Sequence, residues 1–246
     1  YRFTMKKLGE RKFAWKLEGK PKGGDDAAYR VVLAGGILRG AEKNRGRGKL
    51  GIDGDALAAI DPALKVRGKL LTGFWHGTRG AKSLAYALKE FTPDVEQHQP
   101  VSALFRALRG PNGGTLVRFA VRANVGGSPD PATKELLIAR VRWLPGVGGR
   151  ADAVALQGDV PADHVYVSNA CWNAQLQSGF HLVRDWDKTQ QKFVAELKRE
   201  GDLNACKAAL GGEQRPSEDP LADDGATDEE VESEDAPPSM PSGDGL

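Results

Sequence analysis

The residues best suited to chemistry lie in one glycine-rich and basic segment, residues 33–52, which reads LAGGILRGAEKNRGRGKLGI. Glycine lets backbone N–H groups approach a polyanion closely, and interleaved Arg and Lys neutralise phosphates. The composition therefore predicts contact with RNA or DNA, and an ordinary solvated basic turn is the alternative interpretation. The candidate RNA-binding residues of the segment are Gly35, Gly36, Arg39, Gly40, Lys43, Asn44, Arg45, Gly46, Arg47, Gly48 and Lys49.

The flanks of this segment favour an ordered loop over a disordered tail. Residues 29–34 are alternating and apolar, and residues 49–52 resume such a pattern, as packed segments on either side of a loop would. The order of Gly35-Gly36 followed by KNRGRGKL at 43–50 resembles the glycine-rich loop of the RAMP superfamily, the RNA-binding subunits of CRISPR effector complexes.

The RAMP resemblance implies an α+β fold with a ferredoxin-like (RAMP/RRM-type) antiparallel sheet and helices. It also implies crRNA or another RNA as ligand, other RAMP-type subunits of an effector complex as partners, and a role in antiviral defense. The family's loop lies late in its domain, so residues 1–72 would be the closing part of one such domain. Tyr1 is not Met, so we expect the chain to begin inside a longer reading frame.

Charge divides the chain into a basic body and an acidic tail. Residues 213–246 contain twelve acids and one arginine, a net charge of −11, and the whole chain carries +2, so residues 1–212 carry +13. A basic body favours polyanionic partners. The tail is rich in Pro, Ser, Asp and Glu and cannot bury enough apolar surface to fold, so we predict that residues 213–246 are disordered.

Residues 73–212 read as a second α+β segment. Apolar spacing predicts helices at 81–91, 101–109 and 186–199, and alternation predicts strands at 115–124, 135–144 and 164–167. Because strands and helices follow one another without regular alternation, the pattern favours an antiparallel sheet.

The two strands at 115–124 and 135–144 carry a second charge signal. Alternation places Arg118, Arg122, Arg140 and Arg142 on one face of the expected hairpin. Like charges across adjacent strands repel unless an anion or a carboxylate lies over them. We therefore take Arg140 and Arg142 as candidates for an auxiliary RNA surface. The alternative is a solvated face on which the arginines cover apolar neighbours or pair with acids.

The run from Gly73 to Ser83 supplies a third candidate. Phe74 and Trp75 could stack on bases, and Arg79 and Lys82 could hold phosphate, although such aromatic rings are more often core residues. Beside these cations, His76 allows a second function, an endoribonuclease that works by general acid–base chemistry.

Other chemistries lack a motif in this sequence. There is no P-loop, G-x-S-x-G or H-E-x-x-H pattern, so we expect no cofactor and no metal; Asp25 and Asp26 read as solvated turn residues. Cys171 and Cys206 lack metal-ligand spacing and read as free thiols of a cytoplasmic protein. No apolar run approaches 18 residues, so no membrane contact is expected.

Together these features predict a non-catalytic RNA-binding subunit of a type III-like CRISPR effector complex. Two alternatives stay open. One is a CRISPR-associated endoribonuclease, and the other is a nucleic-acid-binding protein unrelated to CRISPR.

Overall fold

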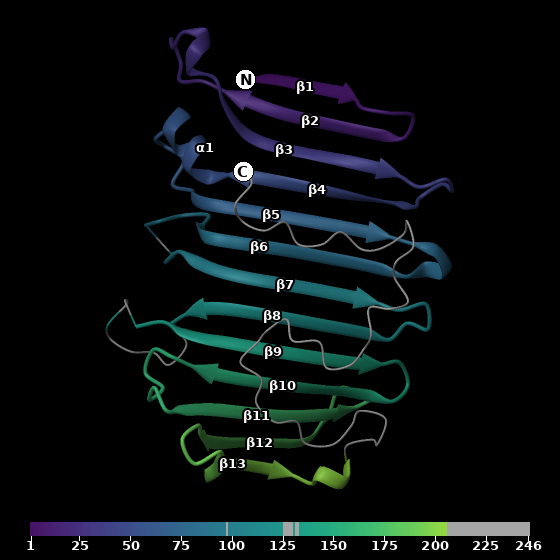
Figure 1. Cartoon of the computed structure of the whole chain (residues 1–246), viewed down its shortest axis with the longest axis vertical. Coiled ribbons are helices and arrows are strands. Elements are labelled where there is room, and N and C mark those ends of the chain that lie inside the picture. Colours follow the sequence, from purple (N-terminus) through teal and green to yellow (C-terminus); the bar gives the residue numbers. More distant parts are fainter. Residues whose placement is uncertain (97, 125–129, 131–132, 206–246) are drawn as a thin grey trace. The chain divides into compact units, whose positions relative to one another are not determined.

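The computed structural model describes residues 1–205 except 97, 125–129 and 131–132. Within these residues thirteen strands form one sheet, in which the strands follow their order in the chain (Figure 1). The strands are β1 (Arg2–Lys7), β2 (Lys12–Gly19), β3 (Arg30–Arg39), β4 (Gly46–Asp53), β5 (Arg67–His76), β6 (Lys82–Thr92), β7 (Val101–Arg109), β8 (Thr115–Ala123), β9 (Glu135–Leu144), β10 (Gly148–Leu156), β11 (His164–Asn173), β12 (Ser178–Asp187) and β13 (Lys192–Gly201). The acidic tail predicted at 213–246 lies outside the described residues.

The expected α+β ferredoxin-like fold is wrong. Helix in the described residues is limited to α1 (Gly54–Ile60) and three short 3-10 turns, η1 (Asp26–Ala28), η2 (Thr78–Gly80) and η3 (Leu203–Ala205). From β1 to β6 and from β8 to β13, neighbouring strands run antiparallel. A ferredoxin-like domain needs helices that pack along its sheet, whereas this chain continues from strand to strand.

The three helices predicted at 81–91, 101–109 and 186–199 are strands for a common reason. The segment 81–91 was assigned to a helix from Leu84 and Leu88, but four residues is both about one helical turn and two full repeats of a strand. In the structure Leu84, Tyr86 and Leu88 share one face of β6, opposite Phe74, Thr72 and Leu70 of β5. The same ambiguity explains 101–109, which is β7, and 186–199, which comprises the end of β12 and most of β13. The strands predicted at 115–124, 135–144 and 164–167 are present as β8, β9 and the start of β11.

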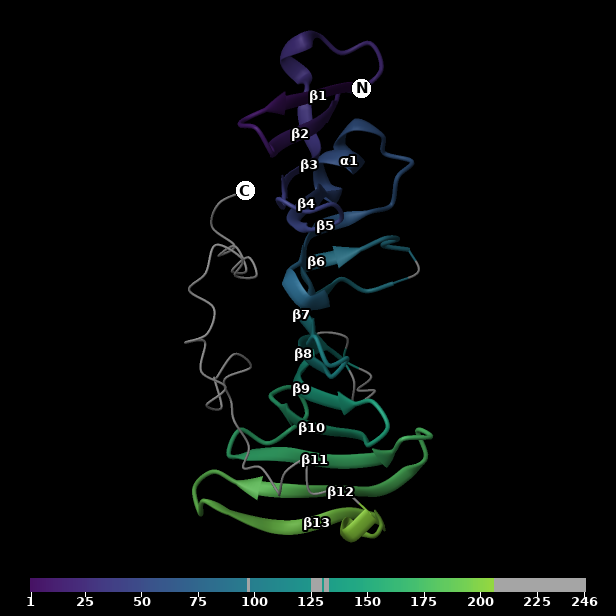
Figure 2. The same ribbon diagram turned by 90° about the vertical axis from the view of Figure 1, so that its right-hand side faces the viewer.

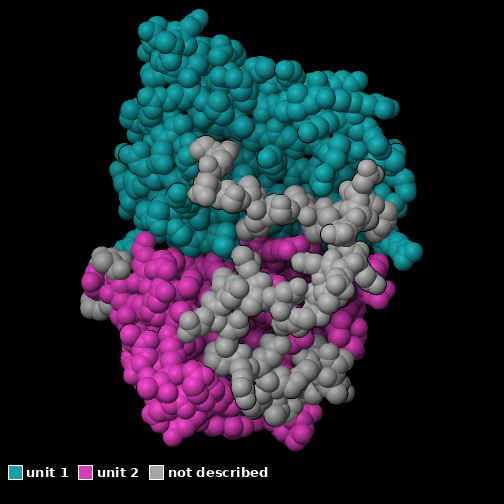
Figure 3. Space-filling model, in the orientation of Figure 1, with its two compact units in different colours: residues 1–104, 228–246 teal, residues 105–227 magenta. Residues whose placement is uncertain are grey.

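The chain falls into two compact units, which are coloured separately in Figure 3. Unit 1 comprises Tyr1–Leu104 of the described residues, and unit 2 begins at Phe105, so the division lies within β7. The glycine-rich segment therefore belongs to unit 1, and the four predicted arginines of β8 and β9 belong to unit 2.

Unit 1 contains the one α-helix of the described chain. The Asp53 side chain caps α1 by accepting a hydrogen bond from the backbone N–H of Ala56 at 2.9 Å, and Pro62 follows shortly after its end. Figures 1 and 2 show α1 beside the adjoining ends of β3 to β5, and it contacts β3 and β5. Ala58 and Ile60 are buried there, so α1 covers one end of these strands and leaves most of their length uncovered.

Unit 2 has the larger apolar core. A cluster of buried residues from β8 to β11 is formed by Ala120, Ile138, Val154, Leu156, Val165 and Val167. Against it packs Trp186, whose ring meets Phe193 edge to face with centroids 4.9 Å apart. A second cluster joins Cys171, Phe180 and Leu182. These side chains alternate along their strands, so the core lies on one face of the sheet of unit 2.

Candidate nucleic-acid interface

The glycine-rich segment is a β-hairpin rather than a loop. Gly35, Gly36 and Arg39 belong to β3, and Gly46, Arg47, Gly48 and Lys49 belong to β4. Gly40, Lys43, Asn44 and Arg45 form the turn, closed by a hydrogen bond from the Gly40 N–H to the Arg45 carbonyl at 2.8 Å. Most backbone groups of the segment are therefore engaged in a sheet ladder and cannot form a cradle for phosphate.

Two of these glycines make room for aromatic rings. A Cβ at Gly35 would lie 2.6 Å from the indole of Trp15, directly across on β2, and a Cβ at Gly48 would lie 2.5 Å from the ring of Phe74 on β5. Real Cβ atoms do not approach other atoms so closely, so a side chain at either position would displace a ring. The glycines serve the packing of strands and rings, which is why the sequence pattern resembled a phosphate-binding loop.

The strand registers sort the side chains of unit 1 onto two faces, because residues directly opposite one another share a face. We call one of them the apolar face. Its members are Phe3, Met5, Phe13, Trp15, Leu17, Leu33, Ile37, Leu50, Ile52, Leu70, Phe74, Leu84, Tyr86 and Leu88.

The opposite face of unit 1 is the basic face. It carries Arg2, Lys6, Lys12, Lys16, Arg47, Lys49, Lys69 and Lys89, with the acids Glu18 and Asp53. Its middle rows run from Lys12 through Leu38 and Arg47 to Trp75, and from Ala14 through Gly36 and Lys49 to Gly73. Lys49 thus lies between Gly36 and Gly73, which leaves its side chain open to a ligand.

The basic face contains both paired and unpaired cations. Glu18 accepts ion pairs from Lys16 at 2.9 Å and from Arg2 at 3.1 Å, and Asp53 lies 3.4 Å from Lys69. The hydrogen bond from Lys16 lowers the pKa of Glu18, partial burial opposes this shift, and Arg2 reinforces it.

The central cations of this face lack such partners. Among the residues that the structure describes, Lys12, Arg47 and Lys49 make no ion pair. Lys12 and Lys49 are exposed, and Arg47 is half-buried.

The predicted cations do not all lie together. Arg47 and Lys49 lie on the basic face, whereas Arg39 and Lys82 lie on the opposite face, in the row that also contains Gly46 and His76. The turns hold the others. Arg45 is paired with Glu42 at 2.6 Å, and Lys43 and Arg79 are exposed.

The neighbouring aromatic residues Phe74 and Trp75 also separate onto opposite faces. Phe74 lies on the apolar face and is 47% exposed. Trp75 lies on the basic face directly across from Arg47, and its indole covers Gly77, where a Cβ would clash with the ring. Trp75 is thus the aromatic ring that the structure places beside the central cations.

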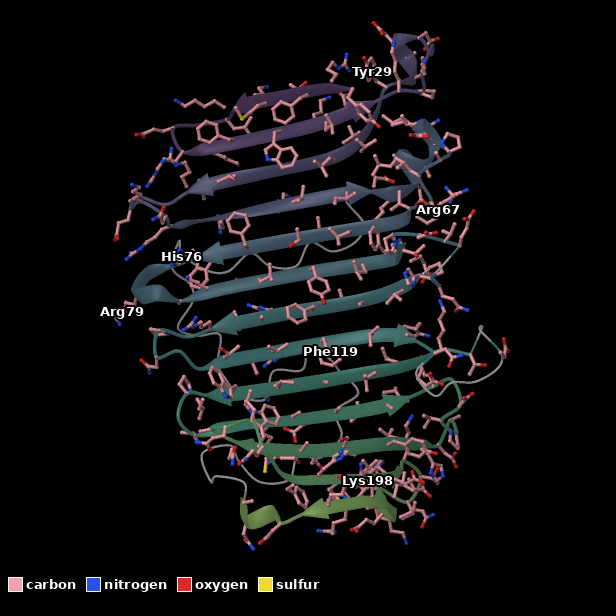
Figure 4. The ribbon with its side chains drawn as sticks, turned by 180° about the vertical axis from the view of Figure 1, so that it is seen from behind. Tyr29, Arg67, His76, Arg79, Phe119 and Lys198 are labelled. Carbon is pink, nitrogen blue, oxygen red and sulfur yellow. The ribbon has the colours of Figure 1, made fainter. Side chains whose placement is uncertain are left out.

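His76 ends β5 next to the η2 turn. Figure 4 shows His76 and Arg79 at one end of the strands, whereas Arg67 lies at the other. The residue directly across from His76 on β6 is Lys82. The endoribonuclease alternative requires a cation beside the histidine, and Lys82 lies in that position.

Asp25 and Asp26 have local structural roles. Asp25 accepts a hydrogen bond from the N–H of Ala28 at 3.1 Å, and Asp26 pairs with Lys20 at 2.8 Å. Within the described part of the chain no group of three His, Cys, Asp or Glu side chains is arranged to hold a metal ion.

Unit 2 contains a different basic group, the arginine cluster, formed by Arg118, Arg140, Arg142 and Arg150. Arg118 lies directly across from Arg140, and Arg142 lies across from Arg150. Arg122 points to the same side, so the shared face of the four predicted arginines is confirmed.

Asp152 anchors this cluster. Its carboxylate lies 2.7 Å from the Arg150 guanidinium and 3.8 Å from that of Arg142, and it accepts a hydrogen bond from the Asn169 amide at 2.8 Å. The Arg150 side chain is only 5% exposed. For Arg142 the structure thus matches the alternative in which the arginines pair with an acid.

The sequence reasoning missed Arg150 and Asp152 because it assigned no strand to 148–156. The alternation of Arg150, Asp152 and Val154 with alanines was the signal that could have found them.

The expectation of free thiols is wrong for Cys171, which is disulfide-bonded in the structure. Residue 206 lies outside the described residues. The sequence had linked free thiols with a cytoplasmic protein, and disulfide bonds are rare in reducing compartments. The compartment stays a prediction. Nothing among the described helices is long and apolar enough to cross a membrane.

Comparisons of this chain with protein-family models, with curated proteins and with solved structures each find no match.

Proposed function

We propose that this chain binds single-stranded RNA along the basic face of unit 1. The observation that carries the proposal is the row in which Arg47 lies between Lys12 and Trp75, with Lys49 beside it. Three cations without a described ion pair and one aromatic ring share a single face, and these are the two kinds of group that single strands need.

The side chains of this face would contact two parts of the RNA, its phosphate backbone and its bases. Lys12, Arg47 and Lys49 would neutralise phosphates, and the surrounding Gly36 and Gly73 would let the strand approach the sheet closely. Trp75 would stack on a base, an interaction that contributes roughly 1–3 kcal/mol without selecting a sequence. Such a surface holds RNA by its backbone and leaves sequence recognition to another component.

Salt-dependent binding measured by fluorescence anisotropy tests this proposal, with a labelled single-stranded RNA and the oxidised full chain. Removing one phosphate-binding cation reduces the slope of log K against log salt by about 0.7 for a single strand, which is about fivefold in affinity at 0.1 M salt. The double variant Arg47→Gln, Lys49→Gln is therefore expected to bind about 25-fold more weakly, with a slope smaller by about 1.4.

The matched control is Arg39→Gln, Lys82→Gln, which removes the same charge from the opposite face. It should bind RNA within about twofold of the parent at 0.1 M salt, because general attraction is screened beyond about 10 Å. Equal losses in both variants would contradict the assignment to the basic face. Heparin binding as tight as RNA, together with unchanged affinity of Trp75→Ala, would contradict nucleic acid as the ligand.

The narrower functions predicted from the sequence remain predictions. Membership of a type III-like CRISPR effector complex depended on a glycine-rich loop that is a hairpin here, so only the RNA ligand is carried into this proposal. Cleavage of RNA would be detected by incubating the chain with repeat RNA and comparing His76→Ala with the parent.

A further inference from the structure

We propose that the apolar face of unit 1 is a dimer interface, on which the same face of a second copy of this chain packs sheet against sheet. The apolar face lies opposite the basic face, so the inference goes beyond RNA binding and does not depend on it. In such a dimer the two basic faces of unit 1 point outward.

The apolar face is a continuous surface of three rows of side chains across β1 to β6. The rows begin at Phe3, Met5 and Lys7 on β1 and continue by direct pairing from strand to strand. Lys7, at the edge of the sheet, is the only charged residue that these described strands place in the three rows. Near the other edge, the Thr72 hydroxyl donates a hydrogen bond to the Ala85 carbonyl at 3.1 Å, so its donor is used within the sheet.

The apolar face is open in the described part of the chain. None of its fourteen large side chains is fully buried, and Phe3, Met5, Ile37, Phe74 and Leu84 are exposed. The apolar cluster of β8 to β11 in unit 2, by contrast, consists of buried residues. A sheet with one apolar face normally buries that face against a second layer, and a large exposed apolar patch marks an interaction site. Unit 1 therefore needs a covering layer.

The size of the face matches what a stable dimer needs. Six strands about 4.8 Å apart and three rows about 6.7 Å apart give a projected area of about 600 Å². Two copies together bury about 1,200 Å², which is where the range of stable and specific interfaces begins. The relief of the side chains adds to this area.

The shape and the charge of the face suit an identical partner. The Trp15 indole lies over Gly35 and the Phe74 ring lies over Gly48, so the rings fill the space that these glycines leave. Level sheet faces pack on one another about 10 Å apart, with their side chains interdigitating. Two copies of a charged face would repel each other, whereas this face carries a single charge at its edge.

The remaining sequence supplies a poorer cover than a second copy does. Residues 206–246 contain five large apolar residues, no aromatic residue and twelve acids. Carboxylates lose their hydration on an apolar surface, which costs free energy. A second copy offers fourteen large apolar side chains over a surface of the same dimensions.

Sedimentation equilibrium of the full-length chain tests the dimer. The parent should be a dimer at about 100 μM, above the dissociation constants typical of interfaces of this kind. Denaturing electrophoresis without reductant distinguishes it from a covalently linked pair. Leu84→Lys puts a charge into the interface from both copies and should raise the dissociation constant about 30-fold, from the lost burial of two leucine side chains. A monomeric parent at this concentration would overturn the inference.

The matched control is Leu64→Lys in the loop after α1. Leu64 is 40% exposed and Leu84 is 46% exposed, so the two substitutions change similar side chains in similar solvent contact. Leu64→Lys should keep the dissociation constant within about twofold of the parent. Equal weakening in both variants would overturn the assignment to the apolar face. If Leu84→Lys does not fold, as judged by circular dichroism, Met5→Lys replaces it.

Oxidation of Met5 by peroxide shows whether the whole face is covered. Met5 is 64% exposed in the single chain and lies on β1, whereas Leu84 lies on β6. Met5 should be oxidised more slowly in the parent dimer than in the Leu84→Lys monomer. Equal rates would place the contact between copies elsewhere and overturn the inference.

Flotation with phosphatidylcholine vesicles tests a lipid surface as the other occupant. The parent should stay with the soluble fraction, because its apolar face is covered by the second copy. A parent that is monomeric and floats with the vesicles, together with a Leu84→Lys variant that does not float, would assign the face to lipid and overturn the dimer.

Discussion

The basic face of unit 1 and the arginine cluster of unit 2 contain the same kind of charge in opposite settings. On the basic face, Lys12 and Lys49 are exposed, and Lys49 lies between Gly36 and Gly73. In the cluster, Arg150 is buried beside Cys171 and is bound to Asp152. An exposed cation keeps its hydration and can exchange it for a ligand, whereas a buried cation must be paired within the protein. Burial, rather than the number of arginines, therefore separates a candidate binding surface from an internal ion network.

The largest expected effect comes from removing the acid of the cluster. Asp152→Asn takes away the carboxylate that pairs with the buried Arg150, and breaking such a pair costs about 3–5 kcal/mol. Urea unfolding followed by circular dichroism measures the free energy of unfolding. The matched control Glu42→Gln, which removes the exposed partner of Arg45, should change it by less than about 1 kcal/mol. Equal losses of unfolding free energy in the two variants would contradict the difference in burial drawn between the two regions.

A smaller loss is expected from Gly48→Ala. The added Cβ would meet the Phe74 ring at 2.5 Å, and overpacking of this kind costs about 1–3 kcal/mol. The RNA affinity of the folded fraction should stay unchanged because the clash lies on the apolar face. Gly110→Ala is the control, since its nearest neighbour would lie 3.8 Å away. If the Gly48→Ala protein kept full stability but no longer bound RNA, Gly48 would have a direct role in RNA binding.

Neutralising the cluster should leave RNA binding nearly unaffected. Arg140→Gln and Arg142→Gln are each expected to keep the RNA affinity within about twofold in the anisotropy assay, at 0.1 M salt where long-range attraction is screened. A reduction as large as that of the Arg47→Gln, Lys49→Gln variant would make both regions parts of the RNA surface.

The smallest effect concerns a titratable pair in unit 2. The hydrogen bond from His164 Nδ1 to Asp185, 2.7 Å long, raises the pKa of His164, against the lowering effect of burial. A raised pKa in the folded state gives stability that is fully present below the unfolded pKa of about 6.5 and is lost as pH rises through the folded value. The difference in melting temperature between the parent and Asp185→Asn should therefore shrink as pH rises from 6 to 8. A difference that grows with pH would exclude this pair as its source.

The sequence allowed good prediction wherever strand alternation was unmistakable. Arg118, Arg122, Arg140 and Arg142 alternate with apolar residues on both sides of an expected turn, so their strands and shared face followed from period two alone. The prediction failed where apolar residues were four apart, as with Leu84 and Leu88, because that spacing suits both helix and strand. It also did not include the packing role of Gly35 and Gly48, since the Trp15 and Phe74 rings that need them come from other strands.

The sequence by itself determined the excess of positive charge in residues 1–212, the acidic character of 213–246 and the alternation of Arg118 and Arg122. These are properties of composition and local order, which a chain carries before it folds. Only the tertiary structure decided that Arg47 and Lys49 share a face with Trp75, that Arg150 meets Asp152 and that Cys171 is not a free thiol. The first two depend on the register between strands, and a shift of one residue would send every side chain to the other face.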